Sequence, residues 1–333
     1  MSKYLIRLTP AEPYFFGDEN TFRVGEPKAS YFIRSLPMPP ATSVIGMLRY
    51  TLLEQNGLLS TNCSYMKSEA HDYLIGNKSY IPGGHNDFGA IKSISPLFIT
   101  DREGNSFVPV PLNHKAGKEK YTPLRLRAAK VSVGGKKMLV PEKGEFDAKK
   151  SVSGQFMNTK TGEIVSDMID ADSDTRVGIR KKDEEDAYFK KAYCRLKAGC
   201  SFAFTAEIDA GLKNTVCYMG RERSPFILEA EKIDDKTLPE ITADCGSEKV
   251  YYALSDLMIK NKLAYEGFAM VSTGKTRMLS TSYDAQKKLN VSPSNKLYSL
   301  IRAGSVFYEK PDADAFYEEG FGLNTIIEIG GNK

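Results

Sequence analysis

The chain has 333 residues, of which 41% are hydrophobic and 11% aromatic, which is typical of a folded protein and excludes a largely disordered one. This length exceeds one comfortable core, so we expect two domains or one domain with long insertions. The net charge of +4 is too small to indicate a nucleic-acid partner unless the charge is concentrated. The five cysteines lack CxxC spacing, which excludes a zinc knuckle of that type and favours reduced thiols in a cytoplasmic protein. No leader or membrane-spanning apolar run is expected.

The chain opens with a predicted strand, a loop and a helix. Residues 4–8 alternate in polarity, and residues 14–16 form a second extended piece. Apolar side chains then recur at helical spacing in the segment 35–57. We expect Thr42 or Ser43 to cap this helix at its start, and the Asn-Gly pair at 56–57 to end it.

A second stripe of the same helix carries Ser43, Gly46 and Arg49 at positions i, i+3 and i+6. Small side chains let a backbone approach, and free N–H groups at a helix start suit a phosphate. The stripe therefore predicts a nucleic-acid contact at Ser43 and Arg49. The alternative is an ordinary amphipathic helix whose arginine is solvated.

Positive charge is concentrated in residues 113–150, where eleven Lys or Arg face four acids. On an extended hairpin, Arg125, Arg127 and Lys130 project to one side, an arrangement that suits a phosphate backbone. A solvated surface is the alternative. We interpret this segment, and the acidic stretch 163–186, as insertions that are partly mobile until a ligand binds.

Strand patterns return after residue 190. Two alternating runs in residues 192–209 predict a hairpin, and a further strand pattern follows Arg221 and Arg223. Residues 234–246 lose apolar periodicity, so we place the domain boundary there. The remainder alternates again, and helix is expected to be scarce.

Cleavage chemistry has little support in the sequence. None of the three histidines lies in a hydrolase or zinc-protease motif, and no metal site or cofactor is predicted. His85, in a glycine-rich loop, is the strongest candidate for acid–base cleavage of RNA, with His114 as a second, although a solvated turn histidine is the simpler interpretation of His85.

Residues 269–276 resemble the end of a phosphate-binding loop, but no long helix pattern follows. Lys275 and Arg277 could still contact a phosphate as plain charges. Near the end, Gly320 and Gly322 precede a closing strand and either admit another backbone or form a tight hairpin turn.

Several segments together resemble one family. LTPAEPYFFGDENTF followed by SLPMPPATSVIGMLRYTLL is similar to the opening of the RAMP proteins of CRISPR systems. ISPLFITDREGNSFVPVPLN, DTRVGIRKK, YMGRERSPF, IRAGSVFY and GFGLN then follow in that family's order. The likeness spans nearly the whole chain, and is greatest to the third subunit of the type III-B Cmr effector complex.

The resemblance implies an α+β fold of tandem ferredoxin-like, RRM-like modules with long β-hairpin and loop insertions. It implies a domain at 1–235, with insertions at about 60–190, and a second domain at 236–333 that carries the glycine-rich loop. It further implies a non-catalytic cytoplasmic subunit for antiviral defence that grips the 5′ handle of the crRNA, beside a large palm-domain subunit and a backbone RAMP subunit. The RNA contacts that it implies are Ser43, Arg49, Arg176, Arg180, Arg221, Arg223, Gly320, Gly322 and Asn324.

Two other functions stay open from the sequence. One is an endoribonuclease of the RAMP type that processes CRISPR RNA with His85 or His114. The other is a purely structural scaffold whose basic segment meets an acidic protein partner.

Overall fold

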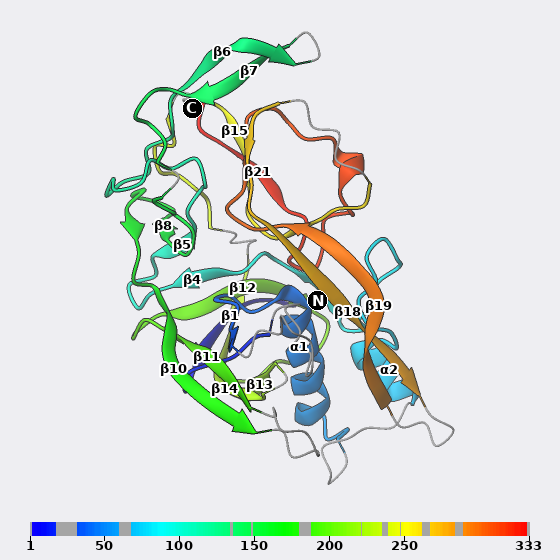
Figure 1. The fold of residues 1–333 in the computed structure, drawn as a ribbon. Coiled ribbons are helices and arrows are strands. Elements are labelled where there is room, and N and C mark those ends of the chain that lie inside the picture. The colour runs from blue at the N-terminus through cyan, green and yellow to red at the C-terminus, as the bar shows by residue number, and fades with distance from the viewer. Residues whose placement is uncertain are drawn as a thin grey trace. The chain divides into compact units, whose positions relative to one another are not determined.

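The computed structural model describes residues 2–17, 32–59, 68–133, 136–147, 149–179, 188–220, 222–234, 239–246, 248–261, 267–283 and 289–331. Within them the helices are α1 (Ala41–Gln55), α2 (Glu69–Ile75) and a 3-10 turn, η1 (Ala313–Ala315). The strands are β1 (Ser2–Pro10), β2 (Phe32–Arg34), β3 (Ile91–Ile94), β4 (Phe98–Thr100), β5 (Ser106–Pro109), β6 (Leu126–Val133), β7 (Lys136–Pro141), β8 (Phe156–Asn158), β9 (Ile164–Val165), β10 (Ile169–Ile179), β11 (Tyr188–Leu196), β12 (Ser201–Ile208), β13 (Thr215–Met219), β14 (Ser224–Ile233), β15 (Val250–Ala253), β16 (Leu257–Met258), β17 (Ala269–Met270), β18 (Thr273–Tyr283), β19 (Leu289–Ile301), β20 (Val306–Phe307) and β21 (Ile326–Ile329). This content, mostly strand with few helices, agrees with the predicted α+β class (Figure 1).

The chain folds into two compact units, each assembled from three separate stretches. Unit 1 consists of Met1–Ile94, Ile169–Lys236 and Lys275–Leu297, and unit 2 consists of Ser95–Met168, Thr237–Gly274 and Tyr298–Lys333. The chain passes from one unit to the other inside the predicted boundary segment, but it also does so at other points. The sequential division into domains 1–235 and 236–333 stays a prediction.

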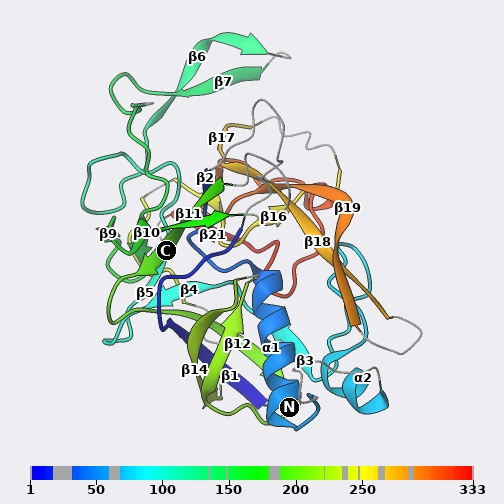
Figure 2. The same cartoon turned by 60° about the horizontal axis from the view of Figure 1, so that its bottom comes forward.

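The main sheet of unit 1 contains β13, β14, β1, β12 and β3 in that order. Its strands are antiparallel, and Ile6 pairs with Phe204 while Leu8 lies between Phe202 and Leu228. These side chains are fully buried, because alternate residues of a strand share one face. The predicted alternation at residues 4–8 is therefore confirmed. In both ribbon views α1 runs alongside this sheet (Figures 1 and 2).

The extended piece predicted at residues 14–16 supplies aromatic side chains to the core of unit 1. The Tyr14 ring lies 5.6 Å from the ring of Phe16 and 5.5 Å from that of Phe202, and its hydroxyl donates to the carbonyl of Pro37 at 2.7 Å. Burial raises the pKa of Tyr14. Phe15 points away from this cluster and contacts Tyr193, with 5.3 Å between ring centroids. Successive residues of one short segment thus serve two different surfaces.

Helix α1 forms where it was predicted, but its N-terminal cap is different. Pro40 is the N-cap, and its carbonyl accepts from the backbone N–H of Ser43 at 2.9 Å. The prediction that Thr42 or Ser43 caps the helix is wrong, because both residues already lie inside the first turn and no side chain makes the cap bond. Asn56 is the C-cap and Gly57 follows at φ +67°, as predicted.

Unit 1 contains a second, three-stranded sheet, in which β11 lies between β10 and β2. The hairpin predicted at residues 192–209 is wrong, although both of its strands exist and a turn joins Cys200 to Lys197. The two strands enter different sheets, because β11 pairs with β10 while β12 pairs with β1. Alternation predicts a strand but does not choose its neighbour.

Unit 2 is built from short strands. One series has the order β4, β5, β8, β9, and a four-stranded sheet has the order β17, β20, β15, β21. The basic segment forms a separate hairpin, in which Arg127 of β6 pairs with Val140 of β7, so the extended hairpin predicted there is confirmed. The scarcity of helix after residue 236 also holds in the part of this region that the structure describes, where η1 is the sole helical turn.

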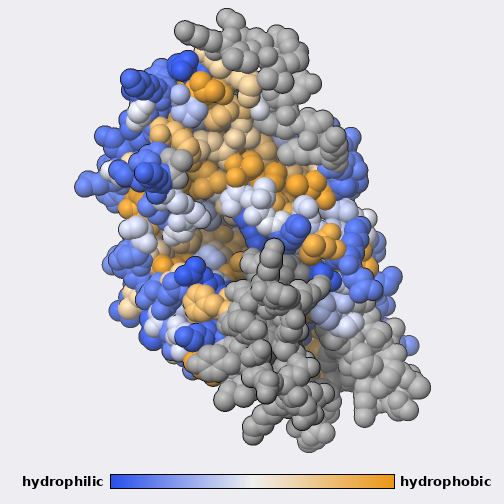
Figure 3. Space-filling view, in the orientation of Figure 1, coloured by the Kyte–Doolittle hydropathy of each residue, from blue (hydrophilic) through white to orange (hydrophobic). Residues whose placement is uncertain are grey.

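The surface drawn in Figure 3 has hydrophobic residues gathered where β15 and β21 lie in Figure 1, with hydrophilic residues along its left margin. Across the described ranges, no helix has the length and apolar character needed to cross a membrane. The described cysteines Cys194, Cys200, Cys217 and Cys245 are free and buried.

Candidate nucleic-acid interface

One face of the β10–β11–β2 sheet brings together cations and aromatic rings from distant parts of the chain. Arg176 of β10 pairs directly with Lys191 of β11, and Asp174 pairs with Tyr193. Directly paired residues share a face, and so do residues two apart on one strand. We call the cluster of Phe15, Arg176, Lys191, Tyr193 and the nearby Glu222 the Arg176 face.

The two rings of the Arg176 face lie beneath its two cations. The Arg176 guanidinium carbon lies 4.2 Å from the centroid of Tyr193, and Lys191 Nζ lies 5.5 Å from the centroid of Phe15. Both rings are buried. Cation–π attraction of this kind holds the charged groups in place at the surface. The rings therefore position charge and are themselves covered.

Each cation also has an acidic partner. Arg176 Nε lies 2.9 Å from Asp174 Oδ2, and Lys191 Nζ lies 2.5 Å from Glu222 Oε1. The hydrogen bond to Asp174 raises the pKa of Arg176, and burial raises that of Tyr193. A phosphate that bound here would exchange with a carboxylate. The Arg176 side chain is 46% exposed against 19% for Lys191, so arginine is the more accessible of the two.

The turn between β13 and β14 supplies Glu222 to this face. Gly220 has φ +72°, and a Cβ there would lie 2.9 Å from the carbonyl oxygen of Phe15, so glycine permits the close approach. Arg223 is also in the left-handed region, at φ +53°, and its guanidinium carbon lies 5.7 Å from the centroid of Tyr218. The predicted contact Arg221 lies outside the described residues.

Lys191, which no prediction singled out, contacts both segments, because it pairs with Arg176 and forms an ion pair with Glu222. The predicted Arg223 lies instead over Tyr218. Arg180 lies outside the described residues. Lys191 and Tyr193 were identifiable only as alternate residues of a strand pattern, and Phe15 only as one ring of a Tyr-Phe-Phe run. Nothing local distinguishes them from core residues.

The helix candidates occupy another part of unit 1. Ser43 is partly exposed in the first turn of α1. Arg49 donates to the carbonyls of Lys78 at 3.1 Å and Gly76 at 3.2 Å, and its guanidinium lies 5.5 Å from the Phe88 centroid. These bonds tie α1 to the segment after α2. RNA contact at Ser43 and Arg49 stays a prediction, and at Arg49 it would have to share these donors.

The basic hairpin of unit 2 is anchored at its base by a buried carboxylate. Glu145 Oε1 accepts from Lys115 Nζ and from Arg125 Nη2, both at 2.9 Å. These two cations lower the pKa of Glu145 to about 2. The two ion pairs therefore contribute their full stabilisation at any pH above the ordinary pKa of a glutamate. This stabilisation is lost only as the pH falls through the lowered pKa of Glu145.

Of the three residues predicted on this hairpin, Arg125 is thus tied to Glu145, and it also lies 3.6 Å from Glu142. Arg125, directly before β6, and Arg127, within it, are both exposed. The register shifts after Ala128, before Lys130, and the Lys130 side chain lies outside the described part. RNA contact at all three residues stays a prediction.

The glycine-rich end forms a tight turn. Gly320 and Leu323 exchange both backbone hydrogen bonds, at 3.1 and 3.0 Å, around Phe321 and Gly322 at φ +49° and +77°. These angles are those of a hairpin turn of type I′. Asn324 is buried, so its side chain has a structural partner: Oδ1 accepts from the backbone N–H of Met258 at 2.6 Å, and Nδ2 donates to a carbonyl.

The phosphate-loop-like segment 269–276 is mostly strand. It contributes to β17 and β18, and both Lys275 and Arg277 lie on β18. A Cβ at Gly274 would lie 2.4 Å from Arg302 Nε, so glycine makes room for a guanidinium rather than for a phosphate loop. Phosphate contact by Lys275 and Arg277 stays a prediction.

The histidines proposed for cleavage have different surroundings. His85 is exposed. His114 is buried, accepts from the Thr122 N–H through Nδ1 at 3.1 Å, and lies 3.2 Å from the Lys118 carbonyl through Nε2. Burial lowers its pKa, which favours the neutral ring. No group of three or more potential metal ligands occurs within the described ranges.

Comparison with known proteins identifies relatives. Residues 6–319 match the family model described as CRISPR-associated protein (Cas_Cmr3). No curated protein matches the sequence. Similar chains occur in cryo-EM structures of the type III-B Cmr-beta complex bound to cognate target RNA, one of them also with AMPPnP. The first is 16% identical, with 92% of this chain and 86% of that chain covered and a TM-score of 0.44; the second is 15% identical, with 92% and 85% covered and a TM-score of 0.42.

Proposed function

Because this chain belongs to the Cmr3 family of CRISPR-associated proteins, we propose that it is a non-catalytic subunit of a type III-B RNA-guided effector complex. In this role it binds the 5′ handle of the crRNA and serves antiviral defence. The observation that carries the proposal is the family match over residues 6–319, which leaves little of the chain unaccounted for. Cytoplasmic location belongs to the same proposal.

The Arg176 face supports RNA binding on physical grounds. It presents an arginine and a lysine held over aromatic rings, and single-stranded RNA is bound through backbone charge together with aromatic or guanidinium planes. The remaining candidates are Ser43, Arg49, Arg125, Arg127, Lys130, Arg180, Arg221, Arg223, Lys275, Arg277, Gly320, Gly322 and Asn324. For Asn324, whose amide is bonded inside the fold, the contact would come from the backbone of the turn.

The same proposal covers architecture and partners. An antiparallel sheet with α1 alongside it supports a ferredoxin-like module in unit 1, and a second such module completes the tandem arrangement that we propose. Docking on the large palm-domain subunit and on a backbone RAMP subunit follows from the family resemblance.

A binding titration tests the proposal. Purified full-length chain, alone and with the large subunit, is titrated against fluorescein-labelled handle RNA at several salt concentrations, with the same RNA in scrambled sequence as control. We expect saturable binding that weakens steeply as salt rises, because bound phosphates release counterions. Absence of salt-dependent binding in both preparations would favour the scaffold alternative.

A cleavage assay addresses the enzyme alternative. Repeat RNA is incubated with the chain without metal and with Mg²⁺, and His85→Ala is compared with wild type. We expect no product from either. Product formed by wild type and lost in His85→Ala would overturn the non-catalytic assignment.

A further inference from the structure

Strand β13 ends the main sheet of unit 1, so one of its two edges has no neighbouring strand among the described residues (Figure 1). Tyr218 of β13 lies opposite Pro225 of β14, and proline has no N–H to donate. The Pro225 carbonyl accepts instead from the N–H of Ala11, at 3.0 Å, on the other side of β14. Tyr218 therefore forms a non-hydrogen-bonded pair, and its N–H and C=O point away from β14.

The backbone of Val216 points the same way, because the direction of these groups repeats every second residue along a strand. The neighbouring Thr215 hydroxyl reaches the Val216 carbonyl oxygen only at 3.4 Å. The ladder to β14 ends at Thr215, since the N–H of Ala230 donates to the side chain of Asn214 at 2.9 Å. Val216 and Tyr218 thus each present an N–H and a C=O along an edge that no described strand occupies.

The side chains beside this edge are apolar and exposed. Val216 is 49% exposed and Tyr218 46%, and Ile227, directly opposite Val216 on β14, is 45% exposed. Val216 and Tyr218 lie two residues apart and share one face of the strand, whereas Cys217 and Met219 alternate with them and are buried. We call these three exposed side chains, together with the backbone groups of Val216 and Tyr218, the β13 edge.

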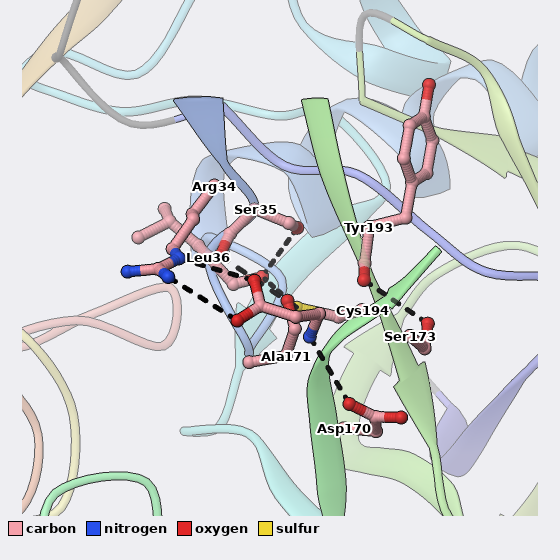
Figure 4. Close-up of polar contacts among 9 residues, drawn as sticks. Arg34, Ser35, Leu36, Asp170, Ala171, Ser173, Tyr193 and Cys194 are labelled. Carbon is pink, nitrogen blue, oxygen red and sulfur yellow. Dashed lines mark hydrogen bonds and ion pairs between the residues drawn. The ribbon is translucent and has the colours of Figure 1, made fainter. Parts of the chain in front are cut away.

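A second sheet of unit 1 protects its outer strand, whereas the main sheet does not protect β13. Strand β10 lies at the end of the β10–β11–β2 sheet, and its register shifts between Asp170 and Asp174. Within this bulge, Ser173 Oγ donates to the Tyr193 carbonyl at 3.2 Å (Figure 4). Charges and bulges keep a free edge from pairing with other chains. The β13 sequence TVCYM has no charged residue, and its register to β14 runs without a shift.

Cations flank the β13 edge at both ends. Lys213 precedes the strand, and its backbone is held by the side chain of Gln55 at 2.7 and 3.0 Å. Arg223 follows the strand and lies over the ring of Tyr218. Both cations are exposed and have no ion-pair partner among the described residues. A second copy of this chain, paired antiparallel, would bring cations against cations, whereas a strand that ends in acids is complementary in charge.

We propose that the β13 edge binds an extended segment of another protein subunit, which adds to the main sheet as a further strand. Alternate apolar residues of this segment contact Val216, Tyr218 and Ile227, and acidic residues at its ends pair with the flanking cations. Main-chain hydrogen bonds supply the affinity of such a complex, and the alternate side chains supply its specificity. RNA fits this edge less well, because its backbone lacks the repeating N–H and C=O groups of a strand. The inference rests on the proposed place of this chain in a multi-subunit complex, for which it names a docking surface.

Amide hydrogen exchange, resolved by residue, tests the proposal in the full-length chain alone, with handle RNA, and in the assembled effector complex. The amides of Val216 and Tyr218 should exchange about tenfold more slowly in the complex, because they become bonded to the added strand. The amide of Cys217 is the internal control, since it is already bonded to β14 in the free chain. Handle RNA alone should leave all three rates unchanged.

Association of Val216→Pro with the other subunits of the complex provides the second readout. Proline removes an N–H that the ladder to β14 does not use, so the fold should tolerate it, and thermal melting checks this. Association should weaken about tenfold through the lost main-chain hydrogen bond. Val216→Thr is the matched control, because it keeps the N–H and the β-branched shape, and it should bind as wild type does. Lys213→Glu should weaken association about twofold to fivefold, and a gain in affinity would contradict an acidic partner.

The outcomes separate this inference from the proposed function. If wild type assembles but Val216 and Tyr218 stay unprotected, the inference fails while the proposed function stands, and this result does not depend on how well Val216→Pro folds. Equal association of a folded Val216→Pro also overturns it. So does protection of the two amides by handle RNA alone, or by self-association of the free chain. If wild type joins no complex, the proposed function fails, and the inference fails with it.

Discussion

Replacing Arg176 and Lys191 together by glutamine should make RNA binding less sensitive to salt. Both cations lie on the Arg176 face, where they are held over buried rings and paired with Asp174 and Glu222. Glutamine retains much of the side-chain length but removes the charge that displaces counterions from RNA. The change is therefore aimed at the phosphate contacts rather than at packing.

The magnitude follows from the number of contacts. Each phosphate neutralised on a single strand contributes about 0.7 to the slope of log affinity against log salt, so two contacts contribute about 1.4. Raising the salt from about 50 to about 200 mM should therefore weaken RNA binding by wild type about sevenfold more than it weakens binding by the double variant. Arg176 is the more exposed of the two, so the single variant Arg176→Gln should account for more of the effect than Lys191→Gln.

The assay is anisotropy of labelled handle RNA at three salt concentrations, with the melting temperature of each variant recorded. Lys249→Gln is the matched control, because Lys249 is an exposed cation paired with Glu328 at 2.7 Å in unit 2. Equal slopes for wild type and the double variant, at unchanged melting temperature, would refute the assignment of phosphate contacts to the Arg176 face.

Three further outcomes follow from the same contacts. Glu222→Gln releases Lys191 from its ion pair, so affinity for handle RNA should rise about twofold to fivefold by anisotropy; a fall would contradict competition between carboxylate and phosphate. Gly220→Ala should lower unfolding free energy by about 1–2 kcal/mol in urea titrations, since its φ is +72°, whereas Gly46→Ala, with open space at its Cβ, should raise it by about 1 kcal/mol. Asn324→Gly keeps the positive φ but loses two buried hydrogen bonds, and should cost about 2 kcal/mol; unchanged stability with weaker RNA binding would instead make the side chain an RNA contact.

Periodicity located most of the individual elements. The alternation of residues 4–8 became β1, and the helical stripe after Pro40 became α1. The alternating runs on either side of Lys197 became β11 and β12, but not as a hairpin. Hydrophobic periodicity reports which side chains of one segment face the core and which face solvent, and this is a local property.

The candidate site was only partly accessible from sequence. Arg176 was identified from a segment that resembles a family, but the lysine and the rings that surround it were not. Lys191 stands out as a candidate only through its contacts with Phe15, Arg176 and Glu222. These residues are distant from it in the chain and are brought near by the fold.

The sequence by itself determined the strand-rich composition, the position of α1, the basic hairpin and the family, because these depend on residue order along single segments. Only the tertiary structure decided which strands are neighbours. That choice sets which cations face acids and which aromatic rings are buried beneath charge. Side chains on a sheet meet across strands, and the partners across a strand are fixed by long-range pairing that no local pattern records.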